Sequence, residues 1–102
     1  RGVWIETMSH IDMVARHSMP AKEAQQAADE LAGDLARKFE INYGWEGDHI
    51  HFERPGVNGM ITVRENEIRI KARLGLMLVF LKPVIETEIS DYLQNHFGCT
   101  FT

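Results

Sequence analysis

The sequence has a single cysteine and no apolar run long enough to cross a membrane. Cys99 alone cannot form a disulfide within the chain, and a lone thiol is typical of proteins from a reducing compartment, so we expect a cytoplasmic protein. A membrane-spanning helix needs roughly 20 consecutive apolar residues. The longest apolar stretch, residues 74–81, is far shorter, which predicts that the chain has no transmembrane segment.

The sequence also lacks a surplus of basic residues. Eleven Lys and Arg against fifteen Asp and Glu give a formal charge of −4, which argues against nucleic acid as a partner. The 102 residues suffice for one domain. The opening "RGVWIET" precedes Met8, which resembles a natural start, so we interpret residues 1–7 as a cloning remnant or an over-extended gene start and residues 8–102 as a single α+β domain.

Recognisable catalytic motifs are missing as well. The chain has no phosphate-binding glycine loop, no nucleophile elbow and no zinc-ligand spacing, so we expect a non-enzymatic protein without a cofactor. His49 and His51 share one face of a strand and are the weak candidates for a metal, but a closed site needs further ligands such as Glu53 or His10, and no metal is predicted. Cys99 follows a helix-ending glycine and is expected to be an unreactive thiol.

The apolar periodicity predicts two helices and five strands. Apolar residues recur every three or four positions from Ala24 to Phe39 and again from Ile85 to Phe97, which is typical of helices over 21–40 and from Pro83 to Gly98. Ser18 is a candidate cap for the first helix. Alternating apolar residues predict strands at 10–16, 41–45, 49–53, 60–63 and 67–74, with turns at "EGD", "RPGVNG" and "REN". The expected fold is one curved antiparallel sheet in the order β-α-β-β-β-β-α, with both helices on one face.

Outward-facing cations follow the last of these strands. Arg69, Lys71 and Arg73 form a cationic ladder that could meet phosphate or carboxylate groups, although pairing across the sheet with Glu53 and its neighbours is the simpler interpretation. The acidic residues Asp29, Glu30 and Asp34 are expected on a solvated helix face, and Tyr43 and Trp45 on the inner face of their strand.

The stretch "LGLMLVFLKP" at residues 74–83 is the main anomaly. If the strand alternation continues past Gly75, the inward positions are Leu76, Leu78 and Phe80, and the outward positions change from the cationic ladder to Met77, Val79 and Leu81. Leaving such side chains in water forfeits about 1.5–3 kcal/mol each, so something should cover them. Three coverings remain open: the chain itself, bending at Gly75 to run beneath the last helix; a second copy, giving a homodimer; or a foreign apolar surface such as lipid, an acyl chain or a hydrophobic polymer.

Several segments together resemble the polyhydroxyalkanoic acid system proteins, a family of small bacterial proteins encoded in regions for polyhydroxyalkanoate synthesis and granule association. The matching segments are the W-E-G-D turn from Trp45 to Asp48, the F-x-R-x-G-V-x-G element from Phe52 to Gly59, the L-G-L-x-L…L-K-P run from Leu74 to Pro83, and the opening "HSMPAKEAQQAADELA". Residues 77–80 are more apolar than this pattern suggests. The resemblance implies a cytoplasmic accessory protein near storage granules and brings no catalytic residues.

Two functional hypotheses follow. The first is a non-enzymatic accessory protein that binds a polyhydroxyalkanoate granule, a granule protein or itself through Met77, Val79 and Leu81. The second is a small binding domain that encloses an acyl or hydroxyacyl group in a cavity between the sheet and the Ala24–Phe39 stripe.

Overall fold

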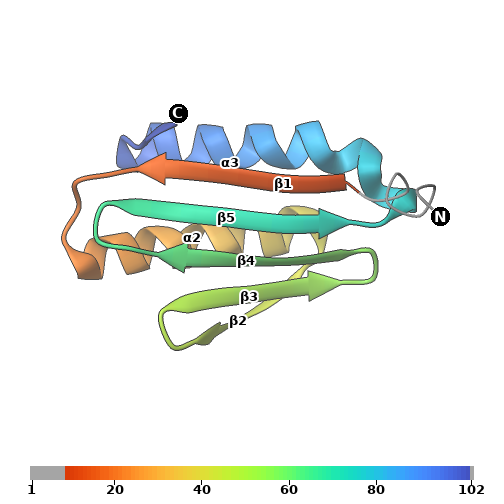
Figure 1. The fold of residues 1–102 in the computed structure, drawn as a ribbon, viewed down its shortest axis with the longest axis horizontal. Coiled ribbons are helices and arrows are strands. Elements are labelled where there is room, and N and C mark those ends of the chain that lie inside the picture. The colour runs from red at the N-terminus through yellow and green to blue at the C-terminus, as the bar shows by residue number, and fades with distance from the viewer. Residues whose placement is uncertain (1–8, 102) are drawn as a thin grey trace.

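The computed structural model describes residues 9–101, and residues 1–7, interpreted above as a remnant, lie outside them. The elements, in chain order, are β1 (Ser9–Arg16), α2 (Ala21–Phe39), β2 (Asn42–Glu46), β3 (His49–Arg54), β4 (Val57–Val63), β5 (Glu67–Leu74), the 3-10 helix η1 (Leu76–Leu81), α3 (Lys82–Phe97) and β6 (Thr100–Phe101). Figure 1 shows the strands side by side with the two helices behind them.

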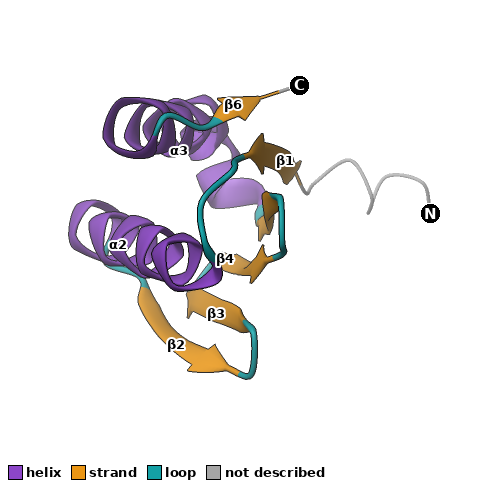
Figure 2. Ribbon diagram, turned by 90° about the vertical axis from the view of Figure 1, so that its left-hand side faces the viewer, coloured by secondary structure: helices purple, strands orange, loops and turns teal. Residues whose placement is uncertain are grey.

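One antiparallel sheet organises the fold, with strand order β2-β3-β4-β5-β1-β6. Both helices pack on the same side of this sheet, as the end-on view in Figure 2 shows. The α+β class, the antiparallel sheet and the helices on one face are confirmed, and the two-residue strand β6 is an addition. We call the side without helices the open face. Among the described residues no helix is long and apolar enough to cross a membrane.

The core lies between the sheet and the helices. The small side chains of α2, including Ala24 and Ala28, let this helix approach the sheet, and both are fully buried. The apolar stripe of α3 is confirmed for Ile85, Ile89 and Leu93, which are buried. That helix ends at Gly98, as the sequence predicted, and Pro83 lies in its first turn. A further buried set comes from the inward positions of the strands: Ile11, Ile50, Phe52, Ile61, Ile68, Ile70 and Leu74.

The turn between β3 and β4 is shorter than the sequence suggested. Pro55 and Gly56 alone form it, and Gly56 has φ +89°, a conformation that other residues rarely adopt. Strand β4 therefore begins at Val57 instead of residue 60. Gly59 belongs to this strand for a packing reason: the ring of its partner Phe52 occupies the place where a Cβ would lie.

The expectation that the strand alternation continues through residues 76–81 is wrong. Strand β5 ends at Leu74, which is paired with Ser9 of β1 and with Val57, the first residue of β4. On the β4 side, a longer strand would leave its backbone groups without ladder partners. The chain instead turns at Gly75, whose carbonyl accepts a 2.9 Å hydrogen bond from the Leu78 amide and opens η1.

Two smaller expectations also fail. Pro20, and not Ser18, occupies the position before α2, and no side chain of residues 9–101 caps this helix. Tyr43 and Trp45 do lie on the helix-side face, but β2 is the edge strand, so the two rings stay 39% and 37% exposed.

Candidate functional site

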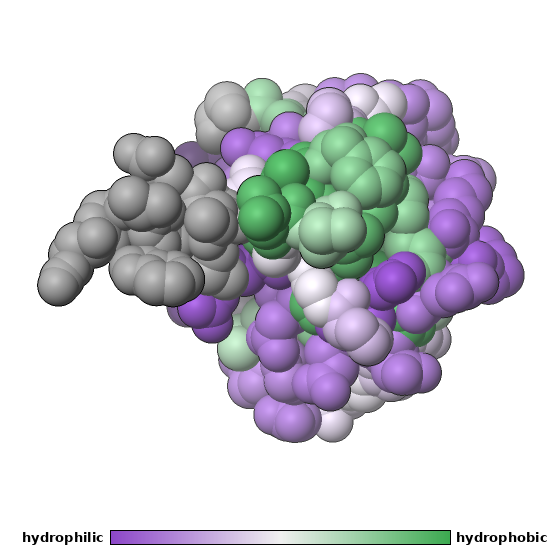
Figure 3. Space-filling model, turned by 90° about the vertical axis from the view of Figure 1, so that its right-hand side faces the viewer, coloured by the Kyte–Doolittle hydropathy of each residue, from purple (hydrophilic) through white to green (hydrophobic). Residues whose placement is uncertain are grey.

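An exposed apolar cluster lies where the chain leaves the sheet and enters α3. Leu76, Met77, Phe80 and Val84 are 60%, 81%, 66% and 51% exposed, and we call these four residues the apolar apex. Figure 3 shows the green apolar surface at this end of the molecule, surrounded largely by hydrophilic residues. Soluble proteins seldom leave large apolar side chains clustered in this way unless the surface has a partner.

The remaining residues of η1 fix the apex to the sheet. The Gly75 amide donates a 2.8 Å hydrogen bond to the Gly56 carbonyl, which joins η1 to the β3–β4 turn. Leu78 lies over Gly56 so closely that a Cβ there would be 2.8 Å from the leucine Cδ1. Leu78 and Leu81 pack against the core, so η1 presents a defined apolar surface.

The three residues predicted to form an apolar interaction surface therefore differ in how exposed they are. Met77 belongs to the apex, whereas Val79 and Leu81 are half-buried. The chain does bend at Gly75, as the first of the three coverings required, but it leads through η1 directly into α3 and does not run beneath that helix. Because η1 replaces a strand, the exposed set follows the turn of a 3-10 helix, and Leu76 and Phe80, predicted to face inward, are exposed.

The open face of the sheet carries the cationic ladder. Arg69, Lys71 and Arg73 all project from β5 on this side, and Lys71 is paired in register with Asp12 of β1. Within residues 9–101, Arg69 approaches a carboxylate, with its Nε 3.9 Å from Glu67 Oε2, whereas Lys71 and Arg73 have none within 4.0 Å. The expected pairing with Glu53 is wrong, because β4 lies between that residue and β5.

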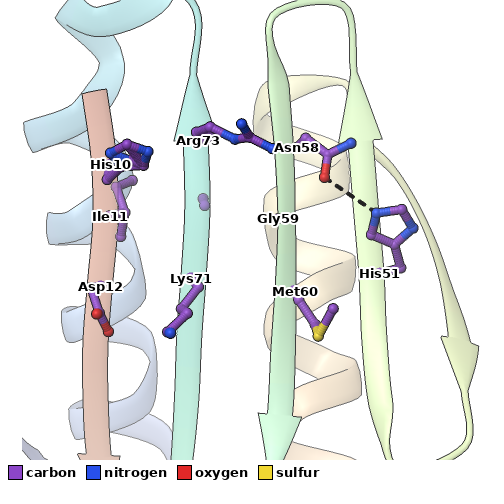
Figure 4. Close-up of a pocket in the computed structure, with 10 residues that line it drawn as sticks. His10, Ile11, Asp12, His51, Asn58, Gly59, Met60, Lys71 and Arg73 are labelled. Carbon is purple, nitrogen blue, oxygen red and sulfur yellow. Dashed lines mark hydrogen bonds between the residues drawn. The ribbon is translucent and has the colours of Figure 1, made fainter. Parts of the chain in front are cut away.

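A shallow hollow of about 350 Å³ lies on the open face beside the ladder. Figure 4 shows its polar rim: Arg73 extends toward Asn58, and Asp12 and Lys71 lie lower on neighbouring strands. The predicted acyl cavity was expected on the opposite side, between the sheet and α2. There Ala24, Leu31 and Leu35 are at most 1% exposed, and this close-packed layer lends no support to an enclosed ligand.

The two weak metal candidates are directed to different neighbours. His49 Nδ1 lies 3.3 Å from Asp48 Oδ1, and His51 Nε2 lies 3.3 Å from Asn58 Oδ1, the bond drawn in Figure 4. In the part of the chain that the structure describes, no three His, Cys, Asp or Glu side chains come together as a metal site would require.

Comparison with protein families shows to which family the chain belongs. The family model described as "Putative polyhydroxyalkanoic acid system protein (PHA_gran_rgn)" matches residues 11–97, from β1 to the end of α3. The chain belongs to this family. The resemblance noted in the sequence is thereby confirmed, and the matched region contains the whole apolar apex.

Comparison with solved structures supports the fold alone. The NMR structure of PA4090 from Pseudomonas aeruginosa is similar with a TM-score of 0.59 at 8% identity, covering 91% of this chain and 94% of that chain. No curated protein matches the sequence.

The segments that resemble the family have identifiable structural roles in this member. In the W-E-G-D turn, the Trp45 indole Nε1 donates a 2.9 Å hydrogen bond to Asp29 Oδ1 of α2. In the F-x-R-x-G element, Arg54 Nη1 donates a 2.9 Å bond to the Phe39 carbonyl at the end of α2. These two contacts hold the β2–β3–β4 meander against the helix, whereas the L-G-L run supplies the exposed apex.

Sequence reasoning missed a buried carboxyl group. Asp34 of α2, expected on a solvated face, is 3% exposed. Burial, and then the neighbouring Glu88 of α3, raise the pKa of Asp34. The hydrogen bond from Asp34 and the ammonium of Lys38, whose Nζ lies 2.7 Å from Glu88 Oε2, lower the pKa of Glu88. A proton retained on Asp34 would let this side chain donate a hydrogen bond to Glu88. Within residues 9–101, Asp34 Oδ2 is a buried oxygen without a hydrogen-bond partner. The sequence did contain a signal for this burial: Asp34 lies three residues after Leu31, and residues at this spacing share one face of a helix.

The environment of Cys99 agrees with an unreactive thiol. Its side chain is 3% exposed, and burial raises the pKa of the thiol, which disfavours the nucleophilic thiolate.

Proposed function

We propose that this member of the polyhydroxyalkanoic acid system family is a non-enzymatic accessory protein that attaches to the polyester surface of storage granules through its apolar apex. The observation that carries the proposal is the apex itself: four large apolar side chains, at least half exposed, on η1 and the first turn of α3, a segment that Leu78 and Leu81 pack against the core. Membership of the family supplies the context, because a polyester of hydroxy acids presents an apolar surface.

The energetics of the apex support attachment to such a surface. Fully burying a side chain of this kind contributes about 1.5–3 kcal/mol. Because Met77 and Phe80 are 81% and 66% exposed, covering them would contribute about 1–2.5 kcal/mol each. Leu76 and Val84 add to this sum. A small patch of this strength suits reversible adsorption, since ordering the bound protein offsets part of the gain.

The geometry favours a surface over a small enclosed ligand. The apolar apex lies at the end of the molecule, as Figure 3 shows, and the hollow on the open face is too shallow to enclose a ligand. A convex apolar tip can enter an amorphous polymer or its apolar coat, whereas enclosing an acyl chain requires a concave apolar pocket.

Co-sedimentation of the purified protein with polyhydroxyalkanoate particles tests the proposal. The test variant is Met77→Ser with Phe80→Ser, and the matched control is Met60→Ser, a 40% exposed methionine on the open face away from the apex. We expect the native protein and the control to pellet. We expect the double variant to bind about 30- to 1,000-fold more weakly, which corresponds to the loss of about 2–4 kcal/mol.

The substituted side chains are exposed, so each variant should keep the circular dichroism spectrum and urea midpoint of the native protein. A native protein that stays in solution, or a folded double variant that binds as tightly as the control, would overturn the proposal. If the double variant instead loses self-association in sedimentation velocity, the apex is an interface between copies of the chain and not a polymer-binding surface.

A further inference from the structure

A second surface is the free edge of the sheet at β2, whose backbone is available for pairing with another strand. β2 is the edge strand, all five of its residues from Asn42 to Glu46 are exposed, and Figure 2 shows it at the lower margin of the sheet with no element beyond it. It has no Pro, no Lys and no bulge, which are three of the devices that prevent edge pairing. It also exposes two aromatic side chains, Tyr43 and Trp45.

The hydrogen-bond pattern of the sheet identifies which backbone groups of β2 are free. The Val63 amide donates to the Asp48 carbonyl, so Asp48 and every second residue of β3 after it bond to β4. His49, His51 and Glu53 therefore bond to β2, where their register partners are Glu46, Gly44 and Asn42. The backbone groups of Tyr43 and Trp45 point away from β3, toward the open edge.

These free groups are self-complementary about Gly44. If a second β2 pairs antiparallel with a two-fold axis at Gly44, each Tyr43 faces the Trp45 of the other copy. Both residues then exchange backbone hydrogen bonds. The two glycines meet at the non-hydrogen-bonded position, where strands approach most closely, at about 4.5 Å between Cα atoms. Asn42 faces Glu46 of the other copy, so no like charges are opposed.

The side chains agree with this register. Tyr43 and Trp45 lie on the helix side, where they would form two cross-strand aromatic pairs, an arrangement that stabilises antiparallel strands. The Trp45 indole is already oriented by its bond to Asp29. Gly44 projects to the open face, and a Cβ placed there would meet nothing within 4 Å.

We propose that β2 pairs with β2 of a second copy, with the two-fold axis at Gly44, to form a dimer with one continuous sheet of twelve strands. The occupant is a second copy of this chain, because the strand is complementary to itself in hydrogen-bond phase and in aromatic pairing, and the pairing opposes no like charges. Only five residues pair on each side, so we expect dimerisation to depend on protein concentration.

Cysteine cross-linking tests the register. Gly44→Cys should form an intermolecular disulfide under mild oxidation, because the Cα separation at this position falls within the range that a disulfide spans. Asn42→Cys is the matched control on the same strand and face; its two copies would be separated by four residues of strand, roughly 13 Å, which a disulfide cannot span. Cys99 is buried and contributes little background.

A charge substitution tests the interface without cross-linking. Gly44→Lys should remain folded, since the site is open and Gly44 has no positive φ, and should shift the protein to monomer in sedimentation velocity. Gly44→Ala should remain dimeric. The proposal is overturned if the native protein stays monomeric at the highest concentration tested, if Gly44→Lys dimerises as the native protein does, or if Asn42→Cys cross-links as readily as Gly44→Cys.

Discussion

Replacing Gly59 by alanine tests whether the close packing between Phe52 and Gly59 requires glycine at this position. An added Cβ would lie 2.6 Å from Phe52 Cε1 and 2.7 Å from the Lys71 carbonyl oxygen. The carbonyl belongs to the β4–β5 ladder and cannot move alone, so the strand must shift. Overpacking of this kind costs about 1–3 kcal/mol, and we expect the upper half of that range because ring and backbone both collide.

Urea unfolding monitored by circular dichroism measures this cost. A loss of about 2–3 kcal/mol should lower the unfolding midpoint by about 1–2 M urea in a domain of this size. Gly44→Ala is the matched control: its new methyl group meets nothing within 4 Å, so stability should be unchanged or slightly higher.

A double-mutant cycle assigns the cause. In a Phe52→Leu background, which lacks the colliding ring atoms, Gly59→Ala should cost clearly less than in the native background. If Gly59→Ala is as stable as Gly44→Ala, or if the cost is the same with and without the Phe52 ring, the packing argument is refuted.

Three further predictions concern polar and thiol groups. Burial and Glu88 raise the pKa of Asp34 above its usual 3.8, so the native state holds this proton more tightly than the unfolded state does, and the stability gained from it is lost as the pH rises through the raised pKa. Asp34→Asn, whose amide can donate to Glu88 at any pH, should therefore flatten the decline of the urea midpoint as the pH rises above about 4; an unchanged profile would contradict this. Cys99 should react with a thiol reagent far faster in urea than in buffer, and equal rates would exclude a buried thiol. Trp45→Phe, which removes the bond to Asp29, should lower the unfolding free energy by about 0.5–1.5 kcal/mol, and no loss would mean that the bond contributes nothing.

The elements with strong periodicity could be predicted from sequence. Helices α2 and α3 and strand β5 have apolar repeats long enough to fix their type, and their observed bounds differ from the predicted ones by one residue or less. Pairing of consecutive strands through short turns then leads to the antiparallel meander. The sequence did not predict the placement of β1 between β5 and β6, because that pairing joins segments far apart in the chain.

Other features depended on information that local sequence does not contain. β5 ends opposite Val57, where its neighbour β4 begins, so the apolar alternation beyond Gly75 was misleading. The exposure of Tyr43 and Trp45 follows from the edge position of β2, which is a property of the whole sheet. Beyond Gly75, the exposure of Met77 was predicted correctly, whereas Leu76 and Phe80 were assigned to the wrong side and Val79 and Leu81 are half-buried.

The apolar apex and the β2 edge together predict that the protein connects polyester particles to one another, which neither surface predicts alone. A two-fold axis perpendicular to the sheet at Gly44 reverses directions that lie in the sheet, so the apolar apexes of the two copies would face away from each other. Such a dimer would not strengthen attachment to one surface but would connect two. We therefore expect the native protein to cluster polyester particles, with turbidity rising as protein is added. Gly44→Lys should still co-sediment with the particles but should not cluster them, because it retains the apex and loses the pairing. Clustering by Gly44→Lys equal to that of the native protein would show that the connection between particles does not pass through β2.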